Sequence, residues 1–226
     1  LIPGTSIRGT LRSRASRIAR TVLAARDELS TFTSHDLHDQ IAAEPNLVRY
    51  MFGSTEYRGA VTVHDCLSTK RGKRIEVTHN AIDRWTGGVI DGGLFTEAVY
   101  LGTHWEPITI DIDLRQLLNN IKAEKGPEDR EQSKPTHADY AHAAYVLLGL
   151  VLAELSAGTL PLGSRSTRGL GQVVVTTIEV EGANRKGVDL PSWYFTGCEA
   201  LQQPATGAGV MTDALYKGQR ELAGRV

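Results

Sequence analysis

The chain has 226 residues, of which 41% are hydrophobic and 23% are charged, a composition typical of a folded globular protein. Its formal net charge of −1 excludes a strongly basic protein, so a nucleic-acid surface would need local clusters of Arg and Lys. No apolar run reaches the length of a membrane span. The two cysteines, Cys66 and Cys198, fit neither a metal site nor a disulfide framework, which favours a reducing cytoplasm.

Residues 6–29 predict a long first helix, because apolar residues recur every three or four positions. Thr5 or Ser6 could cap its first amides. Six arginines occupy the other faces of this helix: Arg8, Arg12, Arg14, Arg17, Arg20 and Arg26. The turn at Pro3-Gly4 and the helix start could seat a phosphate, with Arg8 and Arg12 one turn apart. The simpler alternative, a capped helix with a solvated arginine face, is favoured by these residues alone.

Four segments in the middle of the chain predict strands, namely residues 60–67, 74–78, 94–101 and 107–114. The last of them alternates isoleucine with polar residues, as a half-buried strand does. Residues 68–73 predict a turn and the glycine-rich residues 86–93 predict a loop.

The C-terminal half predicts a second long helix and a further strand. The helix runs from Thr136, with Asp139 completing a capping box, to about Ala157. Gly158 is a usual C-terminal cap. Residues 173–180 are rich in β-branched side chains and predict a strand.

Taken in order, these elements predict an α+β fold. A strand placed before Leu1 would complete β-α-β-β-α-β, the ferredoxin-like order of RNA-recognition modules, so we expect the chain to begin within its fold. We expect a single domain over residues 1–226. Its core would span about 1–181, with insertions near 30–46, 68–93 and 119–135, and an extension at 182–226.

The segment between the second helix and the last strand is a candidate anion-binding loop. Glycines allow close backbone approach and positive φ, successive amides can form an anion-binding nest, and the arginines and hydroxyls add donors. These residues are Gly163, Ser164, Arg165, Ser166, Thr167, Arg168, Gly169 and Gly171. The loop is neither a Walker A motif nor a dinucleotide fingerprint. The alternative is a tight helix-to-strand connection with incidental arginines, and these residues do not decide between the two.

Two His-Asp clusters are weaker candidates. His35-Asp36 and His38-Asp39 could share a helix face and bind a divalent metal, although a solvated helix is the simpler interpretation. His64-Asp65, with His79 and the Asp83-Arg84 pair, could do acid–base work, although structural ion pairs are favoured.

These signals occur in an order that resembles the backbone subunits of type III CRISPR effector complexes, within the RAMP superfamily. The resemblance covers roughly residues 1–181. It is carried by the following motifs in chain order: Ile2-Pro-Gly-Thr-Ser-Ile-Arg-Gly-Thr-Leu-Arg12, Met51-Phe-Gly-Ser54, Val61-Thr-Val-His-Asp65, His79-Asn-Ala-Ile-Asp-Arg-Trp-Thr-Gly-Gly88, Leu94-Phe-Thr-Glu-Ala-Val99 and the glycine-rich loop.

The resemblance implies a modified RNA-recognition fold that polymerises head-to-tail along a CRISPR guide RNA beside other effector subunits. The glycine-rich loop, the first helix with Thr5 and Ser6, and nearby basic residues including Arg84 would hold the guide. A thumb-like hairpin near Ile82-Asp83-Arg84 would intrude between the guide and a single-stranded target RNA. The basic residues 70–74 fit such a grip on the RNA backbone.

Many relatives cleave target RNA with a divalent metal, Mg or Mn, and an Asp that lies just upstream of Ile2-Pro3-Gly4. That Asp has no matching position in this chain, so the sequence assigns no catalytic residue and leaves the enzyme question open. Two alternatives stay open. One is a metal-independent, repeat-processing endoribonuclease using His79 or His64, and the other is a structural subunit that does not bind RNA.

Overall fold

A computed structural model describes residues 1–25, 36, 39, 43–124, 136–163, 165–185 and 188–196. The chain divides into two compact units. The hairpin unit comprises Leu1–Pro3 and His64–Thr109, and the core unit comprises Gly4–Val63 and Ile110–Val226. Both contain short antiparallel sheets, and the described helices lie in the core unit, so the architecture is α+β as predicted.

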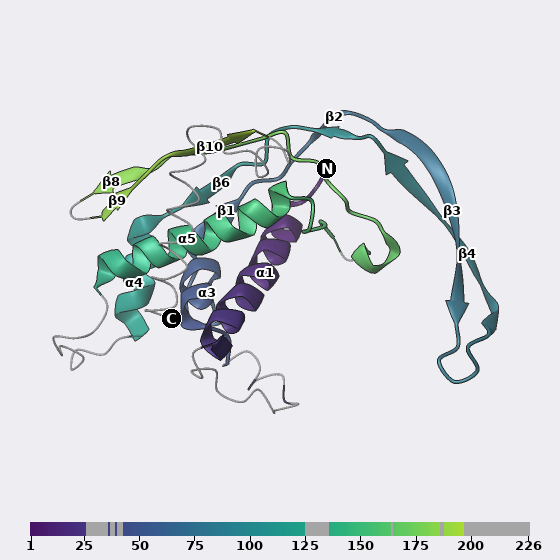
Figure 1. Cartoon of the computed structure of the whole chain (residues 1–226), viewed down its shortest axis with the longest axis horizontal. Coiled ribbons are helices and arrows are strands. Elements are labelled where there is room, and N and C mark those ends of the chain that lie inside the picture. The colour runs from purple at the N-terminus through teal and green to yellow at the C-terminus, as the bar shows by residue number, and fades with distance from the viewer. Residues whose placement is uncertain are drawn as a thin grey trace. The chain divides into compact units, whose positions relative to one another are not determined.

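The core unit is built on four helices, α1 (Gly4–Ala25), α3 (Asn46–Phe52), α4 (Leu114–Glu124) and α5 (His137–Ser156), which pack against one another (Figure 1). Apolar residues spaced three and four apart give α1 one buried face, whereas α5 is buried over most of its surface. The largest buried apolar side chains are Ile7, Leu11, Val48, Met51, Phe52, Leu117, Ile121, Leu147 and Val151. Asn120 is buried among them, and its amide donates to the carbonyls of Tyr50 and Arg58 at 2.9 and 2.8 Å.

Strand β1 (Val61–Val63) pairs antiparallel with β6 (Ile110–Ile112), with Thr62 opposite Asp111. The hairpin unit occupies the connection between these two strands. The chain order α1, β1, β6, α5 and β7 (Thr177–Val180) therefore follows the ferredoxin-like order after its first strand.

The end of the described chain packs on α5. Strand β7 pairs with β10 (Trp193–Thr196), and β8 (Ala183–Arg185) pairs with β9 (Val188–Leu190). Val188 and Leu190 are buried, and the Tyr145 ring lies 4.2 Å from that of Trp193, measured between ring centroids. Burial raises the pKa of Tyr145 to about 12.

Helix α5 begins with the predicted capping box. The Thr136 hydroxyl accepts from the Asp139 amide at 3.3 Å, and the Asp139 carboxylate accepts from the Thr136 amide at 2.8 Å. By length and composition alone α5 could cross a membrane. However, 56% of its most apolar 18-residue stretch is buried inside the structure, as is usual for a core helix.

The hairpin unit is a long antiparallel ribbon on a short base. Strands β3 (Lys73–Ile82) and β4 (Val89–Leu101) form the ribbon, and β2 (Ser68–Lys70) pairs with β5 (His104–Trp105) at its base. The segment before α1 joins this unit through two backbone hydrogen bonds between Ile2 and Cys66, of 2.8 and 2.9 Å. Burial raises the pKa of the Cys66 thiol, which donates to the Glu106 carbonyl at 3.1 Å.

Several predicted boundaries were wrong. Residues 68–70 form a strand where a turn was expected, and β4 begins at Val89, inside the expected loop 86–93. Strand β6 covers only residues 110–112 of the expected strand 107–114, and Asp113 accepts the amides of Arg115 and Gln116 and starts α4. Helix α1 starts at Gly4, so Thr5 and Ser6 lie in its first turn. Most of the expected insertions at 30–46 and 119–135 lies outside the described residues.

Candidate nucleic-acid interface

The glycine-rich loop is closed at its neck by a hydrogen bond from the Leu162 amide to the Gly171 carbonyl, at 2.9 Å. Between these residues the chain forms a single 3-10 turn, Ser166–Arg168. The amides of Arg168 and Gly169 donate to the carbonyls of Arg165 and Ser166 at 3.0 Å. The loop therefore has a defined backbone shape.

Two glycines make this shape achievable. Gly171 has a φ of 82°, and a Cβ at this position would lie 2.0 Å from the Leu162 carbonyl oxygen. Gly169 has a φ of 73° in the left-handed region, but a Cβ there would meet no atom within 4 Å. Gly171 is thus required by both backbone conformation and space, whereas Gly169 is required by conformation alone.

The side chains of this loop face solvent. Arg165, Ser166 and Arg168 are exposed. Gly163, with a φ of 98°, is also exposed. Ser164 lies outside the described residues, and the side chain of Thr167 is not described. Two guanidinium groups on one short glycine-bounded turn provide charged donors suited to phosphate oxygens.

Arg8, predicted to bind RNA, holds the core unit together. Its Nε donates to the Val61 carbonyl at 3.2 Å, and its second guanidinium nitrogen donates to the Phe52 carbonyl. These bonds join α1 to β1 and to the end of α3. Burial, followed by repulsion from Arg12 and Arg58, lowers the pKa of Arg8.

Gly59 leaves the space for the Arg8 guanidinium, and Gly53 allows the close approach of Gly59. A Cβ on Gly59 would lie 2.8 Å from the terminal nitrogen of Arg8 and 2.4 Å from the Phe52 carbonyl carbon. Gly53, which ends α3, has a φ of 86°, and a Cβ there would lie 2.6 Å from the Gly59 amide. The Met51-Phe-Gly-Ser54 segment therefore forms part of the seat of Arg8.

Arg12 is also engaged inside the core unit. Its guanidinium forms a two-pronged ion pair with Glu44, one bond being 3.1 Å long, and the Ser16 hydroxyl donates to the same carboxylate at 2.8 Å. Burial alone would raise the pKa of Glu44, but the hydrogen bonds from Arg12 and Ser16 outweigh it, so this pKa is lowered. Arg14 forms a further ion pair with Glu154 of α5.

The exposed surface of α1 carries mostly small side chains. Thr5 and Ser6 are exposed in the first turn, and Ser13 and Arg17 are exposed further along the helix. The predicted phosphate seat at this helix start therefore consists of hydroxyls and backbone, because Arg8 and Arg12 point their charged groups into the protein.

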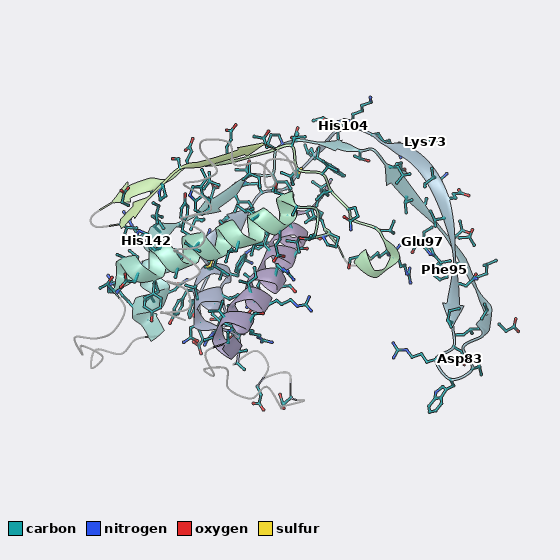
Figure 2. The ribbon with its side chains drawn as sticks, viewed as in Figure 1. Lys73, Asp83, Phe95, Glu97, His104 and His142 are labelled. Carbon is teal, nitrogen blue, oxygen red and sulfur yellow. The ribbon has the colours of Figure 1, made fainter. Side chains whose placement is uncertain are left out.

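Arg84, the last predicted RNA contact, lies at the tip of the ribbon in the hairpin unit. The Asp83 carboxylate organises this tip by accepting the amides of Trp85 and Thr86 at 2.6 and 3.2 Å. The tip is closed by a hydrogen bond from the Asp83 amide to the Gly88 carbonyl, at 2.9 Å. Figure 2 shows Asp83 at the far end of the ribbon from Lys73. Trp85 is 97% exposed, a feature that the sequence analysis did not single out.

The structure describes only part of the two His-Asp clusters, and within the second cluster His64 and Asp65 are exposed whereas His79 is half-buried. His35 and His38 lie outside the described residues. His79 stacks on Phe95 with ring centroids 5.4 Å apart, and its Nε2 is buried 3.7 Å from the Glu97 carboxylate. In the part of the chain that the structure describes, no three His, Cys, Asp or Glu side chains lie close enough together to hold a metal.

These features define a class of protein: an α+β protein with an exposed, arginine-bearing glycine loop and a long hairpin. The family model described as RAMPs: RAMP superfamily matches residues 1–174, and the chain belongs to this superfamily. Membership fits a CRISPR-associated protein with an RNA-binding role. No curated protein matches the chain.

Proposed function

We propose that this protein is a guide-RNA-binding backbone subunit of a type III CRISPR effector complex. The observation that carries the proposal is the exposed loop at residues 162–171, whose glycine-defined turn presents Arg165 and Arg168 to solvent. Membership in the RAMP superfamily supports it.

The chemistry of the loop suits the backbone of single-stranded RNA. Guanidinium groups and hydroxyls bind phosphate oxygens irrespective of base, which is what a subunit that follows a guide of any sequence requires. A chain with a net charge of −1 can bind RNA only through such local basic sites. Thr5 and Ser6, at the exposed start of α1, would add hydroxyl donors to this grip.

The hairpin tip suits a role between two RNA strands. Trp85 is held outward by a turn that Asp83 organises, and Arg84 lies beside it in sequence. An exposed indole can stack on a nucleobase, and a neighbouring cation can approach the phosphates. We place this tip between the guide and a single-stranded target RNA.

The partners of this subunit would be the guide RNA, the target RNA and other effector subunits in the cytoplasm. Copies that associate head-to-tail form an open helical array, which matches the repeated geometry of a guide strand. The proposal is limited to RNA binding.

Binding of the full chain to a fluorescent single-stranded RNA, measured by anisotropy at two salt concentrations, tests the proposal. We expect binding that weakens steeply as salt rises, because released counterions drive association with phosphates. A guide of unrelated sequence serves as the matched ligand and should bind within about threefold, since phosphate contacts carry no sequence information. No binding, or binding insensitive to salt, would contradict the proposal and favour the structural subunit.

The metal-independent nuclease is the alternative, and its candidate general acids or bases are His64, which is exposed, and His79, whose Nε2 is buried. Cleavage of a repeat RNA that persists in EDTA and disappears in His64→Ala or His79→Ala would establish it.

A further inference from the structure

The base of the ribbon carries a second concentration of positive charge. Four cations occur within five residues at the β2–β3 turn: Lys70, Arg71, Lys73 and Arg74. All four side chains are exposed. Figure 2 shows Lys73 and His104 together at this end of the ribbon, away from the tip at Asp83. Lys70 is the cross-strand partner of His104.

An aromatic ring lies within this cluster. The Arg71 guanidinium carbon sits 4.7 Å from the centroid of the Tyr100 ring, and the same guanidinium donates to the Tyr100 hydroxyl. Arg74 is the cross-strand partner of Tyr100 and therefore emerges on the same face of the ribbon. Tyr100 is still 42% exposed. A cation over an aromatic ring that stays open to solvent is a ready stacking platform.

The turn that holds Arg71 is fixed by the backbone. A Cβ on Gly72 would lie 2.2 Å from the Leu101 carbonyl oxygen and 2.7 Å from the Thr103 hydroxyl. The Gly72 amide donates to that hydroxyl at 3.3 Å. Only glycine fits here, so the chain holds Lys70 to Arg74 in place beside β4.

The local charge of this cluster is not cancelled. Glu76 is the one carboxylate within residues 68–76, and it pairs with Arg74 at 3.0 Å. Both side chains are more than half exposed, so the pair contributes little and can exchange for another anion. A phosphate could take the place of Glu76.

We propose that Lys70, Arg71, Lys73, Arg74 and Tyr100, here named the hairpin-base patch, bind a second segment of single-stranded RNA. A nucleobase stacks on Tyr100 and the flanking phosphates contact the cations. The proposal rests on the RNA-binding function proposed above and adds a site separate from the glycine-rich loop. An exposed aromatic ring among cations favours RNA over an acidic protein surface, which would need the charges but not the ring.

Photocrosslinking of the full chain to an oligoribonucleotide containing 4-thiouridine, with peptide mapping, tests the site directly. We expect a crosslink on the peptide that contains Tyr100, retained when Arg165 and Arg168 are both changed to alanine. Tyr100→Ala should weaken RNA binding about tenfold, as loss of a stacking ring does. Tyr100→Phe, which keeps the ring and loses only its hydroxyl, should stay within about twofold and shows that the ribbon is intact.

Lys70→Ala with Lys73→Ala should lower the slope of log affinity against log salt by about 1.4, at about 0.7 for each phosphate contact on a single strand. Lys122→Ala, at an exposed lysine of α4, is the matched control and should change nothing.

Unchanged binding in Tyr100→Ala together with crosslinks confined to the loop would overturn the inference and leave the proposed function standing. Polyglutamate serves as a probe for an acidic protein surface. If the unchanged chain bound polyglutamate, and Lys70→Ala/Lys73→Ala lost that binding while its RNA binding was unchanged, the inference would be overturned in favour of an acidic protein partner.

Discussion

Arg8 and Arg12 of α1 and the two arginines of the glycine-rich loop are pairs of the same residue type in opposite surroundings. Arg8 and Arg12 direct their guanidinium groups to carbonyls and a carboxylate of the core unit. Arg165 and Arg168 are exposed on a short turn. The first pair stabilises the fold that positions α1, whereas the second pair is placed to meet a ligand. A cluster of arginines in a sequence therefore shows only where positive charge lies. The contacts of each guanidinium group in the structure decide whether it stabilises the fold or can bind a ligand.

The largest expected effect follows from removing Arg8. Arg8→Ala leaves the Phe52 and Val61 carbonyls without their charged donor, so we expect the free energy of unfolding to fall by about 2–3 kcal/mol. Urea denaturation followed by circular dichroism measures this. Arg17→Ala, at an exposed position of the same helix, is the matched control and should stay within about 0.5 kcal/mol. Equal effects of the two substitutions would remove the distinction between buried and exposed arginines.

A second prediction compares two glycines of the loop. Gly171→Ala introduces a Cβ 2.0 Å from the Leu162 carbonyl oxygen at a positive φ, so it should open the neck of the loop and weaken RNA binding about tenfold or more. The Cβ of Gly169→Ala would meet no atom within 4 Å, so this substitution should only lower the stability by about 1–2 kcal/mol, the cost of a left-handed backbone conformation. Anisotropy titrations of both variants measure the difference. If Gly169→Ala were the more damaging of the two for RNA binding, the neck would not shape the site.

A smaller effect is expected from Glu44→Gln, which weakens the hold on Arg12. We expect a loss of about 1–2 kcal/mol at neutral pH and a modest gain in RNA affinity, because Arg12 becomes available to phosphate. Unchanged RNA affinity together with the stability loss would show that Arg12 is out of reach of the ligand.

The pH dependence of the same pair has a definite sign. The pKa of Glu44 is lowered in the folded state, so its stabilisation is present above the unfolded value of about 4.3 and is lost as pH falls through the folded pKa. Thermal denaturation at neutral and acidic pH should show a smaller acid-induced loss in Glu44→Gln than in the unchanged chain. An equal acid-induced loss of stability in both proteins would show that ionised Glu44 does not contribute to the stability of the fold.

The sequence predicted the parts of this molecule that depend on local pattern. The heptad-like spacing of α1 and the Thr136–Asp139 capping box identified the two long helices. Helix α4 was missed as a whole, because residues 107–114 read as a strand and residues 119–135 as an insertion, although Asp113 followed by leucines was a usable signal.

The roles of Arg8 and Arg12 could not be predicted locally. Their partners Glu44, Phe52 and Val61 lie 32 to 53 residues away in the sequence, and only tertiary packing brings them together. In retrospect Gly53 and Gly59 marked a tight approach, but nothing in the sequence shows what fills the space they leave. The sequence identified the loop arginines as candidate ligand-binding residues because the glycines on either side of them indicate a turn. The backbone of that turn is formed by local hydrogen bonds, so it can be predicted from the local sequence.

The measurement that tests the central claim most directly is the salt dependence of RNA binding by Arg165→Ala/Arg168→Ala. Each arginine that contacts a phosphate of single-stranded RNA contributes about 0.7 to the slope of log affinity against log salt. We predict that the double variant keeps its unfolding free energy within about 0.5 kcal/mol and loses about 1.4 of that slope. A double variant with the affinity and slope of the unchanged chain would contradict the assignment of the glycine-rich loop to RNA.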